Sequence, residues 1–307
     1  MLSKSVAEDT RWHSKDRRLR QGKAGSERHP RILRPFAYPL RHLHTLLRRN
    51  ALPILAVLMK TFLNYRKSGS NEKVMLTFHG YGQNNTVFEK YKGCTFYHID
   101  LFFHGKSVWP KEEEPLEKSE WKKLIEDVLK KNNITRFSVL GFSMGGKFAM
   151  ATLEAFPDRV NEIILLAPDG IKTSFWYSLA TYPFAFRKLF KSMISNHPRF
   201  LRIASVSKKL GLIDKGVLRF VETQMDSEEK RKRVYYSWVV FRHLKFDPDN
   251  IVMLINQHHI KLRLFVGRYD KIITAKNMTR LTSKIPNSQF EILDAGHNNL
   301  IDKVPPL

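Results

Sequence analysis

Two short runs of apolar residues, EIILLAP at 162–168 and LRLFVG at 262–267, constrain the fold more than any other feature of this chain. Neither run alternates apolar with polar residues, as a strand with one solvent-exposed face would. Both runs are therefore predicted to be strands that are buried on both faces. Such strands occur in mainly parallel sheets that helices cover on each side.

Further segments of both kinds surround these two runs. Strand-like runs cover residues 61–67, 73–79, 94–102, 135–142 and 288–296. The turn-forming cluster SGSNE between the first two of them predicts a hairpin. Apolar residues at helical spacing predict a helix within 115–133, at Trp121, Leu124, Ile125, Val128 and Leu129, and 277–285 is predicted to be another helix. The alternation predicts an α/β fold with a mainly parallel central sheet flanked by helices.

Residues 171–250 interrupt this alternation. The segment is rich in aromatic and basic residues and has no buried-strand pattern. We expect several helices here, inserted between the two buried strands. Acidic residues of this segment are interpreted as the solvated start of a helix: Glu222, Asp226, Glu228 and Glu229.

The formal net charge of +24 is unevenly distributed over the 307 residues. Residues 1–70 carry 16 Lys and Arg against 4 Asp and Glu, and residues 171–250 carry 16 against 7, whereas 71–170 are nearly balanced. A basic arm can bind nucleic acid or anionic lipid, but no nucleic-acid-binding signature accompanies it. We therefore expect no specific nucleic-acid partner.

The first 58 residues are predicted to be a basic extension, either disordered or an over-extended reading of the gene with Met59 as the true start. The apolar run ALPILAVLM, at 51–59, is too short to span a membrane. The single cysteine, Cys94, excludes an intramolecular disulfide and is expected to be buried. These features favour a cytoplasmic protein.

One serine is flanked by glycines, in GFSMGG at 141–146, between a strand-like and a helix-like run. On such an elbow the serine takes a strained backbone conformation that projects its hydroxyl above the sheet. Glycine is needed where a side chain would collide with the backbone, which gives Gly141 and Gly145 turn roles, and Gly146 would let the helix pack closely. The helix dipole would favour negative charge that develops at Ser143, the candidate nucleophile.

A serine nucleophile needs a base, and the base needs an acid that orients it. Asp270 follows the buried strand at 262–267, and His297 follows the last predicted strand. The order Ser, Asp, His is the one expected for a nucleophile-elbow architecture. Asp169, which follows the strand one earlier, remains an alternative acid.

Two backbone N–H groups are expected to stabilise an oxyanion. Met144 would supply one, and the turn at His79, Gly80 and Tyr81 would present the N–H of Tyr81 as the other. His79 and His104, each followed by glycine, are expected to organise loops. No metal-binding motif is present, and neither a metal nor an organic cofactor is expected.

In chain order, the motifs HGYG, FFHGKS, GFSMGG, GRYD and GHNN make the segment from about residue 60 to 303 similar to the α/β-hydrolase fold family. The resemblance implies a core domain of 59–170 and 251–307, with 171–250 as a helical cap or lid over the active site. The family serves many reactions, so the resemblance names no substrate. A serine at position 143 differs from the aspartate of haloalkane dehalogenases and soluble epoxide hydrolases.

The leading interpretation is a serine hydrolase, similar to carboxylesterases and lipases, that cleaves an ester or related acyl bond of a small molecule through Ser143, His297 and Asp270. A carbon–carbon bond hydrolase, a thioesterase and an aminopeptidase remain alternatives on the same triad. A non-catalytic binding protein with a basic nucleic-acid or membrane arm is the alternative from another class. The oligomeric state is not predicted.

Overall fold

The computed structural model of the chain describes residues 60–171, 175–209, 225–286 and 288–305. The predicted basic extension, residues 1–58, lies outside these ranges. None of the helices in this described part has both the length and the apolar character that a bilayer span requires.

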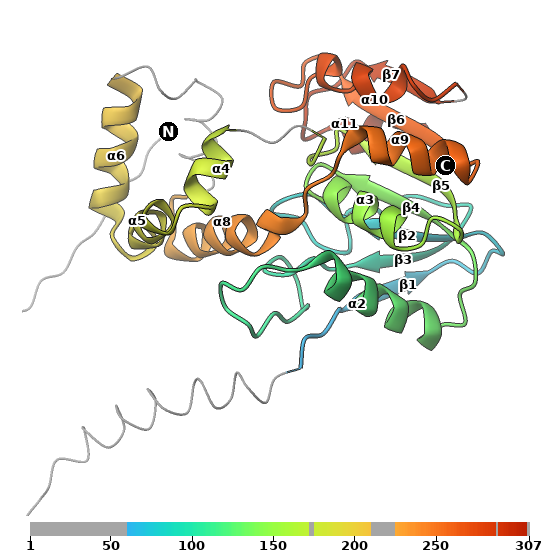
Figure 1. The fold of residues 1–307 in the computed structure, drawn as a ribbon, viewed down its shortest axis with the longest axis horizontal. Helices are drawn as coiled ribbons and strands as arrows, with labels where there is room; N and C mark the ends of the chain where they lie inside the picture. Colours follow the sequence, from blue (N-terminus) through green and yellow to red (C-terminus); the bar gives the residue numbers. More distant parts are fainter. Residues whose placement is uncertain (1–59, 172–174, 210–224, 287, 306–307) are drawn as a thin grey trace, which may run out of the picture. The chain divides into compact units, whose positions relative to one another are not determined.

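A sheet of seven strands forms the centre of the described fold (Figure 1). Its strands are β1 Tyr65–Ser68, β2 Val74–Phe78, β3 Thr95–Ile99, β4 Phe137–Phe142, β5 Val160–Leu166, β6 Lys261–Gly267 and β7 Gln289–Leu293. They lie in the order β1-β3-β2-β4-β5-β6-β7. Only β1 is antiparallel to its neighbour, and the other pairs are parallel. The predicted mainly parallel sheet is thus confirmed.

The predicted hairpin between residues 61–67 and 73–79 is wrong. β1 pairs with β3, with Tyr65 opposite Ile99, while β2 lies between β3 and β4. The reason is burial, because β2 is almost wholly buried and β1 is half-exposed. A strand buried on both faces takes a central position, and the half-exposed strand takes the edge.

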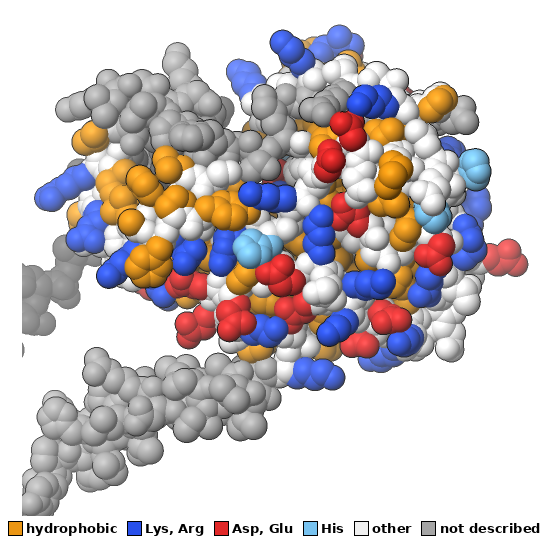
Figure 2. All heavy atoms as spheres, in the orientation of Figure 1, with side chains coloured by type: hydrophobic (Ala, Val, Ile, Leu, Met, Phe, Trp, Pro, Cys, Tyr) orange, Lys and Arg blue, Asp and Glu red, His pale blue; other side chains and the backbone are white. Residues whose placement is uncertain are grey.

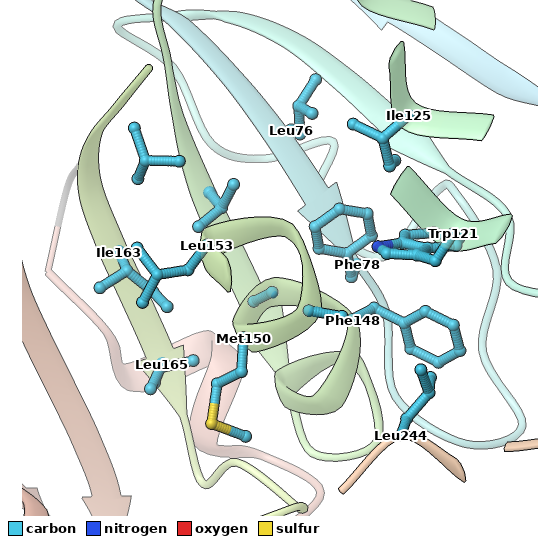
Figure 3. Close-up of a cluster of buried hydrophobic side chains, with 14 of the residues drawn as sticks. Leu76, Phe78, Trp121, Ile125, Phe148, Met150, Leu153, Ile163, Leu165 and Leu244 are labelled. Atoms are coloured by element: carbon cyan, nitrogen blue, oxygen red, sulfur yellow. The ribbon is translucent and has the colours of Figure 1, made fainter. Parts of the chain in front are cut away.

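Helices and hydrophobic clusters cover both faces of the sheet. Among the described residues outside the segment between β5 and β6, the helices are α2 Lys118–Lys131, α3 Gly145–Ala155, α10 Thr279–Thr282 and α11 Leu300–Lys303, and η2 Ala275–Asn277 is a short 3-10 turn. Successive strand residues enter different clusters: Val139 belongs to one and Leu140 to the other. In the larger cluster, side chains of α2 and α3 pack on β2, where Phe78, Trp121 and Phe148 are in contact (Figure 3).

Two helix predictions have different outcomes. The helix predicted within 115–133 is confirmed as α2, which buries four of its five predicted apolar residues. The helix predicted over 277–285 is reduced to the four residues of α10, preceded by the 3-10 turn η2. Cys94 is buried, as expected, and burial raises the pKa of its thiol.

In the described residues between β5 and β6, all of the regular secondary structure is helical. These residues form α4 Phe175–Thr181, α5 Phe184–Ser195, α6 His197–Lys209, α8 Glu228–Val240, the 3-10 turn η1 Phe241–His243 and α9 Pro248–Gln257. Helix α5 packs on α8, where Phe190 contacts the ring of Tyr235. Glu113, in the loop before α2, pairs with Lys191 of α5 and accepts a hydrogen bond at its backbone oxygen from Arg242. Helix α9 differs from α4, α5, α6 and α8, which pack on one another, because α9 packs on α3 of the core.

Candidate active site

The strand–turn–helix elbow lies between β4 and α3. Ser143 has a φ of 51°, in the left-handed region that a side chain disfavours. A Cβ added at Gly145 would lie 2.0 Å from the backbone oxygen of Phe78, and one added at Gly141 would lie 2.5 Å from the oxygen of Gly145. Both glycines are therefore required by close approach of the backbone. At Gly146 an added Cβ would meet the proline after β5, so this residue also permits close packing.

A chain of hydrogen bonds joins the three residues that the sequence predicts as nucleophile, base and acid. The Oγ of Ser143 lies 2.8 Å from Nε2 of His297, and Nδ1 of His297 lies 2.6 Å from Oδ2 of Asp270. The second oxygen of Asp270 accepts the backbone N–H groups of Ile272 and Ile273, at 2.8 and 2.9 Å. Three donors therefore hold the carboxylate and fix its orientation toward the imidazole.

The surroundings of this chain of hydrogen bonds exclude much of the solvent. The side chain of Asp270 is 0% exposed and that of His297 is 13% exposed. The imidazole lies against the ring of Phe142, with centroids 5.2 Å apart. Electrostatic interactions between these groups are stronger here than they would be in water.

Asp169, the alternative acid, has a different partner. Its Oδ2 lies 3.0 Å from Nζ of Lys147, whose side chain is 9% exposed, and its Oδ1 accepts the N–H of Gly170. Burial acts to lower the pKa of Lys147, but Asp169 and Tyr177 outweigh burial and raise the pKa above its ordinary value. Lys147 is therefore a buried cation that needs Asp169 as its counter-ion.

The loop after β2 carries one of the two candidate oxyanion donors, Tyr81. The adjoining His79 is buried and connects this loop to the end of β3, because its Nε2 accepts the N–H of Leu101 and its Nδ1 donates to the oxygen of Gly80. Burial lowers the pKa of His79 to about 4, so the ring is neutral in this role. The N–H of Gly80 donates to Oε1 of Gln83.

The other candidate donor, Met144, directly follows Ser143 and is the N-cap residue of α3. Its N–H therefore belongs to the amide groups at the start of that helix, where an anion is favoured. His104 organises the loop after β3: its Nδ1 donates to the oxygen of Phe102, and its ring meets that of Tyr81 edge-on at 4.9 Å. Burial lowers the pKa of His104 to about 3.

Asp100 is a structural residue of the site that sequence reasoning missed. This buried carboxylate follows β3 and accepts the N–H groups of Asn85 and Lys106 and the side-chain amide of Asn64. It thereby connects the loop after β2 with the loop after β3. A Cβ at Gly105 would lie 2.2 Å from the carboxyl carbon. The signal was an aspartate within an apolar run, two positions before the start of the motif FFHG.

Other acidic residues lie at the surface in ion pairs. Asp294, three residues before His297, pairs with Arg268. The acidic residues at the start of α8 pair one helical turn along: Asp226 with Lys230, Glu228 with Lys232 and Glu229 with Arg233. Glu222 lies outside the described residues. Over the described ranges, no group of three or more His, Cys, Asp or Glu side chains is arranged to hold a metal ion.

Comparisons with known proteins bear on the family and the fold of the chain. A family model described as alpha/beta hydrolase fold matches residues 73–304. The structure is similar to that of a carboxylesterase from the thaumarchaeon Nitrososphaera gargenis, with a TM-score of 0.54 and 16% identity over 78% of this chain and 89% of that one. It is also similar to a thermophilic esterase from Thermogutta terrifontis, with a TM-score of 0.55 and 19% identity over 78% and 87%.

A sequence relative extends the comparison. An uncharacterized protein of Mycobacterium tuberculosis is 23% identical over 251 residues, which cover 76% of this chain and 72% of the relative. At these identities, the solved structures bear on the fold of the chain and leave its substrate open.

Proposed function

The chain belongs to the α/β-hydrolase fold family, and from this premise we propose that it is a serine hydrolase that cleaves an ester or related acyl bond. The observation that carries the proposal is the chain of hydrogen bonds from Ser143 through His297 to Asp270. Each member has the partner that its role requires, and the serine lies on a strained turn at the start of a helix.

In the proposed mechanism, the Oγ of Ser143 attacks the acyl carbon as its proton passes to Nε2 of His297. Asp270 accepts the Nδ1–H, so Nε2 is the unprotonated nitrogen that can act as base. The same carboxylate stabilises the imidazolium after the transfer. His297 then gives its proton to the leaving group, and a water molecule deprotonated by His297 cleaves the acyl-enzyme.

The N–H groups of Met144 and Tyr81 would stabilise the tetrahedral oxyanion in both halves of the reaction. Loss of one such donor costs about 3 kcal/mol of transition-state stabilisation in comparable sites. The buried His79 and Asp100 would act as positioning residues, because they fix the loop that carries Tyr81 to the loop after β3.

We further propose that residues 171–250 act as the cap or lid that limits substrate shape, over a core of 59–170 and 251–307. Contacts between the inserted helices and the loops of the site support this: Phe103, in the loop after β3, stacks on Tyr236 of α8 with centroids 5.6 Å apart. The similar solved structures include a carboxylesterase and an esterase, so esters are the first substrates to test. An aminopeptidase would need carboxylates of the cap near the amine of its substrate. The described carboxylates at the start of α8 are instead paired with Lys and Arg of that helix, which disfavours this alternative.

The test is Ser143→Ala, with Ser283→Ala at an exposed serine as the matched control. We expect Ser143→Ala to abolish labelling by a fluorophosphonate probe and to lower kcat for a p-nitrophenyl ester by about 10⁴- to 10⁶-fold. The control should retain both activities. Unchanged labelling of Ser143→Ala would refute the mechanism, and a panel of esters, thioesters and aminoacyl substrates would separate the alternatives.

A further inference from the structure

Helices α5 and α6 expose an unusual number of large apolar side chains. Ten such side chains are exposed among the residues that the structure describes, and five of them lie on these two helices: Phe184, Phe186, Leu189, Leu201 and Val206. Their exposed fractions run from 41% to 69%. Single exposed apolar residues are normal, but a concentration of them indicates an interaction surface.

The same helices are strongly basic. Residues 175–209 contain seven Lys and Arg and no Asp or Glu. Lys188, Arg199 and Arg202 are exposed beside the apolar side chains, and Figure 2 shows hydrophobic and basic side chains side by side over these helices. Helix α8 differs, because its Lys and Arg pair with acidic residues one turn away. Residues 175–209 contain no acidic residue for such pairs, and there Arg187 and Lys191 pair instead with Glu113 of the loop before α2.

The packing of the two helices directs these side chains outward. Helix α5 buries Phe190 and Ile194, which are one turn apart, in a cluster with residues of α8. On α6, exposed residues recur at intervals of three and four, at Pro198, Leu201, Arg202, Ser205 and Val206. This spacing places them on one helix face. We call the exposed residues of α5 and α6 the α5–α6 surface: Phe184, Phe186, Lys188, Leu189, Arg199, Leu201, Arg202 and Val206.

We propose that the α5–α6 surface docks on an anionic lipid membrane. Apolar side chains enter the boundary between headgroups and acyl chains, and Lys and Arg side chains contact lipid phosphates. Nucleic acid would use the basic side chains but would gain little from exposed Phe and Leu on the outer faces of helices. A second copy of the chain would bring together two surfaces whose charged residues, Lys188, Arg199 and Arg202, are all basic, and their repulsion disfavours that occupant.

The first test changes the charge of the surface in the full chain. The triple variant Lys188→Glu, Arg199→Glu, Arg202→Glu is compared with a control of equal charge change at exposed lysines elsewhere, Lys92→Glu, Lys123→Glu, Lys276→Glu. Sedimentation with vesicles of phosphatidylcholine and phosphatidylglycerol measures binding, and phosphatidylcholine vesicles give the uncharged reference. Because each basic residue near an anionic surface contributes about fivefold to partition, the triple variant should lose about 100-fold or more. The control should lose much less.

The second test changes the apolar character at constant charge. Phe186→Ser with Leu201→Ser removes two side chains that are 46% and 52% exposed, and Ile292→Ser with Met253→Ser removes two that are 44% and 52% exposed outside the surface. The first pair should lower partition into the anionic vesicles by about tenfold or more, and the second pair should not change it. Thermal unfolding of each variant checks that the fold is retained.

Three results would overturn the proposal. Binding to anionic vesicles that neither the charge variant nor the apolar variant lowers would show that another part of the chain binds lipid. Binding lowered by the charge variant alone would indicate a polyanion site such as one for nucleic acid. Self-association of the chain that both variants abolish, measured by analytical ultracentrifugation, would assign the surface to a second copy.

Discussion

Replacing Asp270 by Asn separates the role of its charge from the role of its shape. One carboxylate oxygen accepts two backbone N–H groups, from Ile272 and Ile273, and the other accepts Nδ1–H of His297 at 2.6 Å. Asn has the same shape but only one oxygen, and its amide group donates where the second oxygen accepted. The variant must therefore give up one of the two sets of hydrogen bonds.

The energies of the two orientations decide which set is lost. If the amide oxygen turned to His297, the NH₂ group would face two buried N–H donors, and each donor left without an acceptor costs about 1–3 kcal/mol. If the oxygen stays on Ile272 and Ile273, the NH₂ group donates to Nδ1 of His297. That nitrogen must then be unprotonated, so the proton moves to Nε2, and Nε2 can no longer accept the proton of Ser143. The second orientation is favoured.

Asp270→Asn should accordingly lower kcat for a p-nitrophenyl ester by about 10⁴-fold, equivalent to about 5 kcal/mol of activation free energy, because the imidazole is held in the wrong tautomer. The melting temperature should change little, because the two backbone hydrogen bonds persist. Asp294→Asn is the matched control: its side chain is 74% exposed and pairs with Arg268 at the surface. A turnover within tenfold of the unmodified chain for Asp270→Asn, together with a large loss of turnover for Asp169→Asn, would refute the assignment of the acid.

Two further predictions concern stability. Gly145→Ala should lower the free energy of unfolding by about 3 kcal/mol or more, because the added Cβ would lie 2.0 Å from the backbone oxygen of Phe78. Urea titration measures this change, and Gly296→Ala is the control because its added Cβ would lie 3.5 Å from the nearest atom. Equal effects of the two substitutions would contradict the argument. Burial lowers the pKa of His79 and of His98 to about 4, so the unfolded state, with a histidine pKa near 6.5, binds more protons between these two values. The free energy of unfolding should therefore fall as the pH drops from about 6.5 to about 4, by up to about 3 kcal/mol per histidine, and a constant value over this range would contradict it.

The central strands could be predicted from sequence because burial on both faces leaves a continuous apolar run in the chain. β5 and β6 lie within the predicted runs EIILLAP and LRLFVG except for one or two residues at their starts. The pairing of β1 could not be predicted in the same way. A turn cluster is a local signal that favours pairing of adjacent segments. The buried strand β2 is instead paired with β3 and β4, one on each side, and β1 pairs with the free edge of β3.

At the site, too, features that depend on neighbouring residues in the sequence could be predicted, whereas those that depend on contacts in space could not. Ser143 and His297 could be proposed from the glycines around them and from their places at strand ends. The choice between Asp169 and Asp270 could not be made on that basis, since both follow buried strands. In the structure, Asp270 is hydrogen-bonded to His297, whereas Asp169 pairs with Lys147. This cation lies one helical turn beyond Ser143, on α3.

The elbow at Ser143 depends on the strands on both sides of β4. The short motif around Ser143 therefore carries information about the order of the strands in the sheet. The strained Ser143 costs about 1–3 kcal/mol in backbone conformation and needs surrounding structure that holds it. On one side, its N–H donates to the oxygen of Leu166 at the end of β5, and its own oxygen accepts the N–H of Asp169 just beyond. On the other side, Gly145 approaches the oxygen of Phe78 at the end of β2. A serine on such a turn is therefore stable only where β4 lies between β2 and β5, which is the strand order observed.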